Sequence, residues 1–376
     1  MEVSEGHWNS NVGCQRTRPI RVVHMGSGHT GIEGLKGILA DPALELVGWY
    51  VSSPEKEGLD AGEFCSLPAV GIKATRSIDA LLKLKPDCAY YGSSIIGREK
   101  EATAEVVCFL ERGINVATFA LLQMVYASAA PEEMRQAIEQ ACEKGDATFF
   151  ASGSEPGVFT TTLPATLLSA AGRITRYREQ QFIPDIIAAY PVVDVIRDSM
   201  GFGQPMATTP RRFADDTALE WWKPNLCMIA DKLGVEIEDV TFTLKKHALD
   251  RDIDTELGLF KAGTMGAYWW ELAAIINGKP ALSIEYICQL TRECTVPVDW
   301  PQAAPDTREC AVVYRVEGVP ELKMQVYMSN TPGEKNPSVR VTALHVVNAI
   351  PCVVAADKGI HNALELPYYT TRNIDF

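Results

Sequence analysis

The chain has few of the features that direct a protein out of the cell or into a membrane. Residues 1–10 are polar and lack the basic and apolar regions of a secretory signal. We expect no membrane-spanning segment, because no run of about 18 apolar residues is apparent. The ten cysteines form no CxxC pair, which is typical of reduced thiols. Together these absences predict a cytoplasmic protein.

Basic residues are scarce, and the histidines are not arranged to hold a metal. The 35 Lys and Arg residues against 48 Asp and Glu give a formal net charge of −13. Nucleic acids and anionic membranes both require clustered positive charge, so we predict neither as a partner. The six histidines form no HExxH or HxxxH pair, and no metal site is predicted.

The length of 376 residues exceeds that of a usual single core and favours two domains. From residue 19 to 151, short apolar strands alternate with helices, which predicts an α/β, doubly wound Rossmann domain with a parallel sheet. Longer strands with alternating patterns follow between residues 174 and 328, and predict a C-terminal α+β domain with a large, open mixed sheet. The predicted division is a leader at 1–16, a dinucleotide-binding domain at 17–156 completed by 338–376, and a second domain at 157–337.

Three glycines form the most informative motif. Gly26, Gly28 and Gly31 follow a predicted strand at 19–25 and open a predicted helix. Gly26 permits a tight turn, Gly28 lets the backbone approach a pyrophosphate, and Gly31 allows close packing of helix on strand. The helix N-terminus offers free amides to the phosphates. This context predicts a dinucleotide site.

The end of the second predicted strand bears on the choice of cofactor. An NAD site usually has an acidic side chain there, which binds the ribose 2′-hydroxyl. This chain instead has Ser52, Ser53 and Lys56, which can hold a 2′-phosphate. We therefore predict NADP, with NAD as the alternative through Glu55.

Four segments carry a family resemblance: Gly26–Gly31, 52–56, Gly153–Gly157 (GSEPG) and Met200–Gly203 (MGFG). Through them the chain resembles the dihydrodipicolinate reductase-like superfamily. Within it, the order of motifs is most similar to native amine dehydrogenases and 2,4-diaminopentanoate dehydrogenases. The resemblance extends from about residue 18 nearly to the C-terminus. It implies a substrate-binding second domain whose open sheet pairs two subunits in a homodimer.

The resemblance also assigns residues to the cofactor. The pyrophosphate would be surrounded by Gly26, Ser27, Gly28, His29, Thr30 and Gly31. The adenosine ribose would be contacted by Ser52, Ser53 and Lys56. The nicotinamide would lie beside Gly92, Ser93, Gly153, Pro156 and Gly157.

Two departures from the family pattern matter. Dihydrodipicolinate reductases carry a His-His motif and a downstream Lys, and residues 177–190 contain neither. Amine dehydrogenases place a catalytic Glu just after the strand that here ends near Phe119, and residues 118–126 contain no acid.

Proton transfer must therefore come from another group. Glu155 is the first candidate, because burial beside the nicotinamide would raise its pKa toward the working pH; the alternative is that it caps the following helix. Tyr126 and Tyr177 are further candidates, or else partly buried aromatic residues. For Glu179 we predict a structural pairing.

Aromatic residues between positions 149 and 270 predict an apolar pocket that suits a hydrophobic ketone, imine or amine; the alternative for any one of them is a place in the domain core. The residues concerned are Phe149, Phe159, Tyr177, Phe182, Phe202, Trp269 and Trp270. The predicted function is an NAD(P)-dependent oxidoreductase that transfers hydride to or from a C=N or C=O carbon. The alternatives are an ammonia-independent ketone reductase and a non-catalytic NADP-binding sensor.

Overall fold

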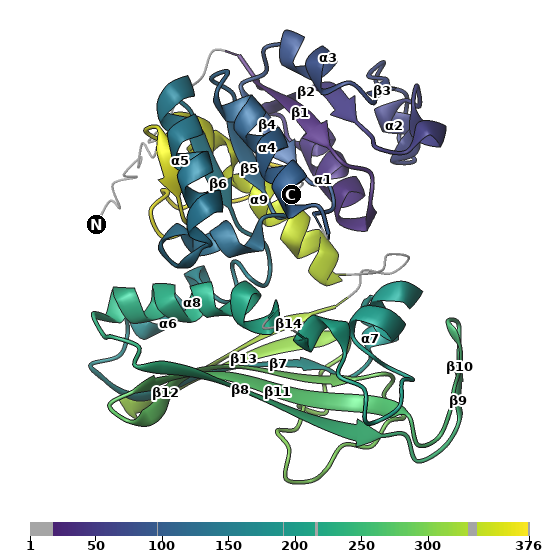
Figure 1. The fold of residues 1–376 in the computed structure, drawn as a ribbon, viewed down its shortest axis with the longest axis vertical. Helices are drawn as coiled ribbons and strands as arrows, with labels where there is room; N and C mark the ends of the chain where they lie inside the picture. The colour runs from purple at the N-terminus through teal and green to yellow at the C-terminus, as the bar shows by residue number, and fades with distance from the viewer. Residues whose placement is uncertain (1–17, 96, 191, 215–216, 330–336, 375–376) are drawn as a thin grey trace, which may run out of the picture.

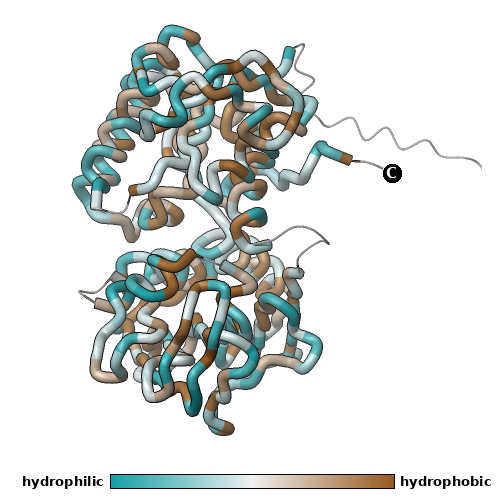
Figure 2. The backbone as a smooth tube through the Cα atoms, turned by 90° about the vertical axis from the view of Figure 1, so that its right-hand side faces the viewer, coloured by the Kyte–Doolittle hydropathy of each residue, from teal (hydrophilic) through white to brown (hydrophobic). Residues whose placement is uncertain are grey.

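The computed structural model describes residues 18–374 apart from 96, 191, 215–216 and 330–336. Two large β-sheets, each with its own helices, form two lobes that lie one above the other (Figure 1), and a two-stranded sheet of β9 and β10 accompanies the second. A view from the side shows the same two lobes separated by a narrow waist (Figure 2).

Seven parallel strands form the first sheet, in the order β15-β6-β5-β4-β1-β2-β3. The order reverses between β1 and β4, the place where doubly wound sheets bind ligands at the carboxyl ends of their strands. The predicted Rossmann fold class is thus confirmed. The strands are β1 (Ile20–Met25), β2 (Leu44–Tyr50), β3 (Ala74–Thr75), β4 (Cys88–Tyr91), β5 (Asn115–Thr118), β6 (Thr148–Ala151) and β15 (Gly359–His361).

Helices cover both faces of this sheet, which is why strands such as β4 and β6 are buried at every position. One face packs against α1 (His29–Ala40) and α9 (Pro337–Ala355). The other packs against α3 (Ile78–Lys83), α4 (Glu99–Leu110) and α5 (Glu132–Gly145).

Helix α9 returns from the second lobe to lie beside α1. The Tyr90 hydroxyl donates a 3.2 Å hydrogen bond to the carbonyl of Ala343. By length and composition, α9 could cross a membrane. We expected no such segment from the sequence, because Arg340, His345 and Asn348 interrupt the apolar pattern of this helix. Its packing against α1 and the sheet accounts for its apolar residues.

Six strands form the second sheet, in the order β14-β13-β7-β12-β11-β8. Strands β7 and β12 are parallel and the other neighbours antiparallel, which confirms the predicted mixed sheet. The bounds are β7 (Arg173–Ile183), β8 (Asp239–Ala248), β11 (Met265–Ile276), β12 (Lys279–Gln289), β13 (Cys310–Val319) and β14 (Leu322–Met328).

The inner face of this sheet is covered by α6 (Thr162–Leu168) and α8 (Thr217–Leu233), and α8 lies between the sheet and the first lobe (Figure 1). Because side chains alternate along a strand, Tyr177, Glu179 and Gln181 share the inner face of β7. The outer face carries a separate apolar cluster of Phe182, Ile287 and Val313.

The shortest elements were not predicted from the sequence. They are α2 (Ala61–Phe64), α7 (Ile186–Ala189), β9 (Ile253–Thr255), β10 (Gly258–Phe260), β3, β15 and the short helices η1 (Pro54–Lys56), η2 (Leu122–Ala129), η3 (Val195–Ser199) and η4 (Arg211–Phe213). Such segments are too short to show a helix or strand period. The apolar pattern of residues 159–171 favours a helix, but only the shorter α6 forms there.

Candidate active site

The loop between β1 and α1 has an open side. Gly26 has a φ of +116°, and a Cβ atom there would lie 2.5 Å from the carbonyl oxygen of Gly92. A Cβ atom at Gly28 would meet no atom within 4 Å. Gly26 is therefore required by the turn itself, whereas Gly28 leaves room in front of the backbone for a ligand.

Two buried side chains hold this loop in place. The Trp49 indole donates a 2.9 Å hydrogen bond to the carbonyl of Gly26. The His24 Nε2 atom lies 2.8 Å from the carbonyl oxygen of Gly31. Burial lowers the pKa of His24 to about 4, so it is the neutral core residue that its position in β1 predicts. The amides of the first turn of α1 have no partner within the helix and remain available for phosphate.

The predicted adenosine-side residues gather at the ends of β2 and β3. Lys56 donates to the carbonyl and hydroxyl oxygens of Ser27, each at 3.2 Å. Arg76, which follows β3, donates a 3.2 Å hydrogen bond to the carbonyl of Ser52. Arg76 was not predicted, because a two-residue strand gives no pattern from which its end could be located.

Glu55 lies at the same strand end and is exposed. Hydrogen bonds from its own backbone amide and from the Ser53 side chain lower the pKa of its carboxyl group, and the charges of Lys56 and Arg76 lower it further. The turn therefore presents two cations and one anion.

The predicted nicotinamide-side residues lie at the carboxyl ends of β4 and β6. Ser93 is buried, and the amide of Gly92 donates to the carbonyl of Met25 at 2.8 Å. The Ser154 and Thr342 hydroxyls are 2.6 Å apart, which ties the loop Gly153–Gly157 to α9. The loop also carries the chain from the first sheet into the second lobe.

The segment after β5 is apolar, in agreement with the missing acid of the sequence. Ala120 and Leu121 are both buried. Tyr126 lies in a different place from the other catalytic candidates, in a small pocket with Asp231 of α8 and Asn362. The structure does not bring Tyr126 to Glu155.

Glu155 places its carboxyl group between the lobes, shielded from solvent. Neither of its oxygens completes a hydrogen bond within the described part of the chain. Burial raises the pKa of Glu155 to about 8, while nearby Tyr286, Gln181 and Arg212 act to lower it. Glu155 as a whole residue is partly exposed, whereas both oxygens of its carboxyl group are buried.

Glu179 and Tyr177 lie beside Glu155. The Tyr177 hydroxyl donates a 3.2 Å hydrogen bond to Glu179, and both residues are fully buried. Burial and the neighbouring charge of Glu155 raise the pKa of Glu179 far above its ordinary value. Glu179 thus pairs with a phenol, and among the described residues no ion pair engages it. Two adjacent buried carboxyl groups favour a state in which they hold at least one proton between them.

The seven aromatic residues predicted to form one pocket are distributed over three cores. Phe159, Tyr177, Phe202 and Trp270 pack under α8, Phe149 lies in the first lobe, and Phe182 and Trp269 lie on the outer face of the second sheet. That prediction was wrong for Phe149, which lies on β6 of the first sheet. It was also wrong for Phe182 and Trp269, because an alternating strand sends neighbouring aromatics to opposite faces. Trp222, Tyr268 and Tyr286 take their place on the inner face.

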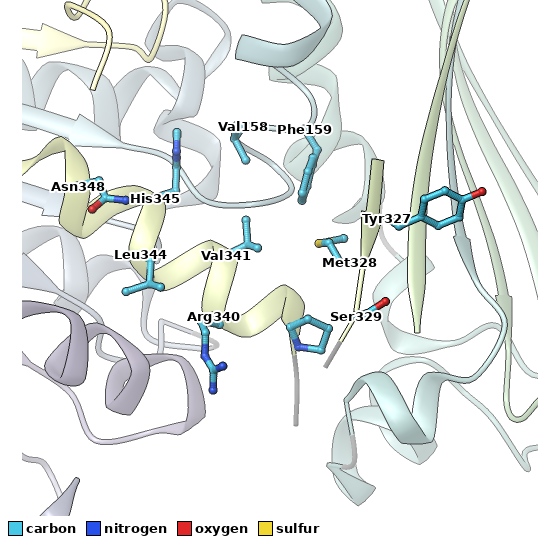
Figure 3. Close-up of a pocket in the computed structure, with 11 residues that line it drawn as sticks. Val158, Phe159, Tyr327, Met328, Ser329, Arg340, Val341, Leu344, His345 and Asn348 are labelled. Carbon is cyan, nitrogen blue, oxygen red and sulfur yellow. The ribbon is translucent and has the colours of Figure 1, made fainter. Parts of the chain in front are cut away.

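A separate open pocket of about 540 Å³ lies along α9 (Figure 3). Val158, Phe159 and Met328 line one side, and Val341 and His345 of α9 line the other. It adjoins the loop that carries Glu155 but contains none of the predicted catalytic residues.

Comparisons with known proteins agree with the fold described above. No family model matches the chain. An amine dehydrogenase from Streptomyces virginiae is 31% identical over 351 residues, which cover 93% of this chain and 96% of that protein. A 2,4-diaminopentanoate dehydrogenase from Acetoanaerobium sticklandii is 20% identical over 271 residues, covering 71% and 70% of the two chains. The solved structure of an amine dehydrogenase from Mycobacterium smegmatis superposes with a TM-score of 0.72 at 20% identity, and covers 94% of this chain and 98% of that one.

Proposed function

The chain belongs to the amine dehydrogenase family, and from this relationship we propose that it interconverts a hydrophobic amine and the corresponding ketone with NADP as preferred cofactor. The resemblance seen in the sequence and the prediction of an NAD(P)-dependent oxidoreductase for amines or imines are confirmed by the relatives. The identity of the cofactor, the hydrophobic substrate and the acid–base residue form the proposal.

The residues present fit a dinucleotide. Gly28 leaves open space before the backbone, and the first turn of α1 supplies amides and the positive end of a helix dipole for a pyrophosphate. When bound, the nicotinamide supplies the hydride acceptor or donor. The protein must then bind the substrate beside it and move protons.

The preference for NADP rests on Lys56 and Arg76 at the strand ends. Two cations suit a 2′-phosphate, which carries about two negative charges. We expect NADPH to bind at least tenfold more tightly than NADH in a fluorescence titration. Arg76→Met should reduce that ratio, and Lys83→Met, an exposed substitution on α3, should not. Equal affinity of the wild-type protein for both cofactors would overturn the preference.

The observation that carries the proposed chemistry is the desolvated carboxyl group of Glu155 at the end of the β6 loop. In the oxidative direction, Glu155 would take a proton from the substrate ammonium and release it to solvent, and the bound nicotinamide would supply the hydride acceptor for the substrate carbon. The regenerated carboxylate would then take a proton from the water that adds to the iminium and pass it to the nitrogen. The nitrogen leaves as ammonia, which takes up the hydroxyl proton and becomes ammonium. The sum is R₂CH–NH₃⁺ + NADP⁺ + H₂O giving R₂C=O + NH₄⁺ + NADPH + H⁺.

The test is oxidation of NADPH in the presence of a medium-chain ketone, with and without ammonia. Ammonia-dependent oxidation that is lost in Glu155→Gln, while NADPH still binds, supports the proposal. If Glu155→Gln keeps full activity, the proposed proton carrier is wrong. Tight NADPH binding without turnover of any amine or ketone would favour the sensor.

One observation favours the second candidate, an ammonia-independent ketone reductase. The segment after β5 has buried Ala120 and Leu121 where the family pattern has an acid. A ketone needs one proton at its oxygen and no handling of ammonia, so a single neutral Glu155 is sufficient. NADPH oxidation that is unaffected by ammonia identifies this activity.

We further propose a cytoplasmic homodimer. The support is the family resemblance, which implies that the open face of the second sheet pairs two subunits about a two-fold axis. Sedimentation at micromolar concentration tests this, and a monomer would contradict it.

A further inference from the structure

The loop that carries Glu155 is a tight turn closed by its own backbone. The amide of Val158 donates a 2.9 Å hydrogen bond to the carbonyl of Gly153. A Cβ atom at Gly157 would lie 2.0 Å from the same carbonyl oxygen, so no larger residue fits there. Glu155 therefore lies at the tip of the turn, and the direction of its carboxyl group depends on how the turn is held.

Threonine hydroxyls bond both backbone polar groups of Gly157. Its amide donates to Thr160 Oγ1 at 2.9 Å, and its carbonyl accepts from the Thr161 hydroxyl at 2.6 Å. Both threonines are fully buried. A hydroxyl has a single proton to donate, so the orientation of the Thr160 hydroxyl depends on the acceptor of that proton.

The acceptor is supplied by α8. The Thr160 hydroxyl donates to Asn225 Oδ1 at 2.7 Å. The alternative acceptor, the carbonyl of Gly157, is 3.2 Å away and already accepts from Thr161. Asn225 thereby keeps a lone pair of the Thr160 oxygen directed at the Gly157 amide.

Asn225 is a polar residue on the apolar face of α8. Trp222, Leu226 and Ile229 on that face belong to the core of the second lobe, and Asn225 is as deeply buried as they are. A buried amide group costs free energy unless it is hydrogen-bonded. In the described part of the chain, its side chain bonds the Trp222 carbonyl of its own helix, at 3.3 Å, and Thr160. Its partner outside α8 is therefore the segment that carries Glu155.

The two halves of the turn are held by different lobes. The Ser154 and Thr342 hydroxyls are 2.6 Å apart, which ties the first half to α9 of the first lobe. Gly157 is tied through Thr160 to α8, which lies on the second sheet (Figure 1). Glu155 lies between these two ties, so their relative position determines where its carboxyl group points.

The groups that face Glu155 belong to the second lobe. The titratable ones are Tyr177 and Glu179 of β7, Tyr286 of β12, Cys310 and Tyr314 of β13, and Arg212 of η4. The Tyr314 hydroxyl also donates a 2.8 Å hydrogen bond to the carbonyl of Phe159, which fixes the chain two residues beyond Gly157. The bond to α8 is the one that reaches Gly157 itself.

We propose that Asn225 is a positioning residue for the reaction: through the Thr160 hydroxyl it holds Gly157, and with it the carboxyl group of Glu155, against the second sheet. This inference rests on the proposed function, in which Glu155 carries the proton. Without the acceptor on Asn225, the Thr160 hydroxyl turns away, the turn loosens and water reaches Glu155. The desolvation that raises the pKa of Glu155 then decreases, and this pKa falls toward its ordinary range.

The test measures oxidation of 2-aminohexane with NADP⁺ as a function of pH, using the full-length enzyme. In Asn225→Leu and in Thr160→Val we expect kcat to fall about tenfold while KM stays within about threefold. The pKa of the rising limb of the kcat profile should decrease by about one unit or more in both variants. Because the two residues act through one chain of hydrogen bonds, the double variant should be within about twofold of the slower single variant.

Two further variants serve as controls. Thr160→Ser keeps the hydroxyl and should restore the wild-type profile. Thr166→Val, the same substitution at an exposed position of α6, should leave it unchanged. An unshifted pKa in both single variants, or losses of kcat that multiply in the double variant, overturns the inference. If Asn225→Leu does not fold, the comparison of Thr160→Val with Thr160→Ser decides, and equal profiles for these two overturn it.

Infrared titration separates this result from failure of the proposed function. The C=O stretch of protonated Glu155, identified by its absence in Glu155→Gln, can be followed with pH without any substrate. If the wild type oxidises no amine, but the titration midpoint of Glu155 falls by about one unit or more in Thr160→Val and Asn225→Leu, the positioning role is supported and the proposed chemistry is wrong. Equal midpoints in the variants and the wild type overturn the positioning role.

Discussion

The Nε2 atom of His24 lies 2.8 Å from the carbonyl oxygen of Gly31, so that a core side chain of β1 fixes the first turn of α1. The imidazole also stacks on Tyr90, with ring centroids 5.2 Å apart. The cofactor loop is therefore supported from within the core of the first lobe.

This relationship predicts acid sensitivity. The pKa of His24 is about 4 in the folded protein and about 6.5 when unfolded. The unfolded state therefore binds more protons between these values, and stability is lost as pH falls from about 6.5 to 4. His345, whose pKa burial also lowers to about 4, contributes in the same direction. His24→Gln should remove about half of the decrease in melting temperature over this window; an unchanged pH dependence would contradict the assignment.

The glycines of the loop should respond differently to alanine. Gly28→Ala meets no protein atom, so we expect a melting temperature within about 2 °C of the wild type but at least tenfold weaker NADPH binding. Gly26→Ala places a Cβ atom 2.5 Å from a backbone oxygen at a φ of +116°, and should cost about 2 kcal/mol or more of stability. Thermal melts and cofactor titrations of both variants measure the difference. Similar melting temperatures for the two would show that the loop is less tightly packed than described.

Glu155 predicts the pH dependence of activity. Its raised pKa means that the carboxylate needed for amine oxidation forms only as pH rises toward about 8. Oxidative kcat should therefore increase with pH up to that range, and the reductive rate should decrease above it. Glu155→Gln should lower both rates by about 10²-fold or more, whereas Glu133→Gln on the exposed face of α5 should not. Steady-state rates between pH 6 and 10 provide the measurement.

Glu179 predicts alkaline sensitivity. Its folded-state pKa is raised far above the ordinary value, so the folded protein holds a proton that the unfolded chain releases. The stabilisation is complete below pH 4 and decreases as pH rises toward the folded pKa. Glu179→Gln should therefore raise the melting temperature relative to the wild type more at pH 9 than at pH 5. If the melting temperatures of the variant and the wild type differ by the same amount at every pH in this range, Glu179 is not held buried and protonated.

Periodic features of the sequence were sufficient to predict the two sheets, and local features were sufficient for the cofactor loop. β1, α1 and the three glycines are adjacent in the chain, so their geometry is encoded locally. The family resemblance supplied the expected position of the nicotinamide, beside Gly92 and Gly153, because the order of motifs fixes which strand ends meet.

The remaining residues of the site depend on long-range packing. Arg212 lies on a three-residue helix, and only the second sheet brings it to Tyr286 and Tyr268. The pairing of Glu155 with Glu179 joins a loop of the first lobe to a strand of the second. Neither contact follows from spacing along the chain, which is why Glu179 was assigned a structural role and Arg212 received none.

The placement of α9 and β15 in the first lobe has a consequence for biosynthesis. Strand β1 leaves the ribosome more than 300 residues before the helix that covers one side of its sheet. During that interval the apolar surface of α1 and β4 has no permanent cover, and the second lobe is synthesised while the first is still incomplete. A nascent chain should therefore acquire its affinity for nucleotide only at the very end of translation.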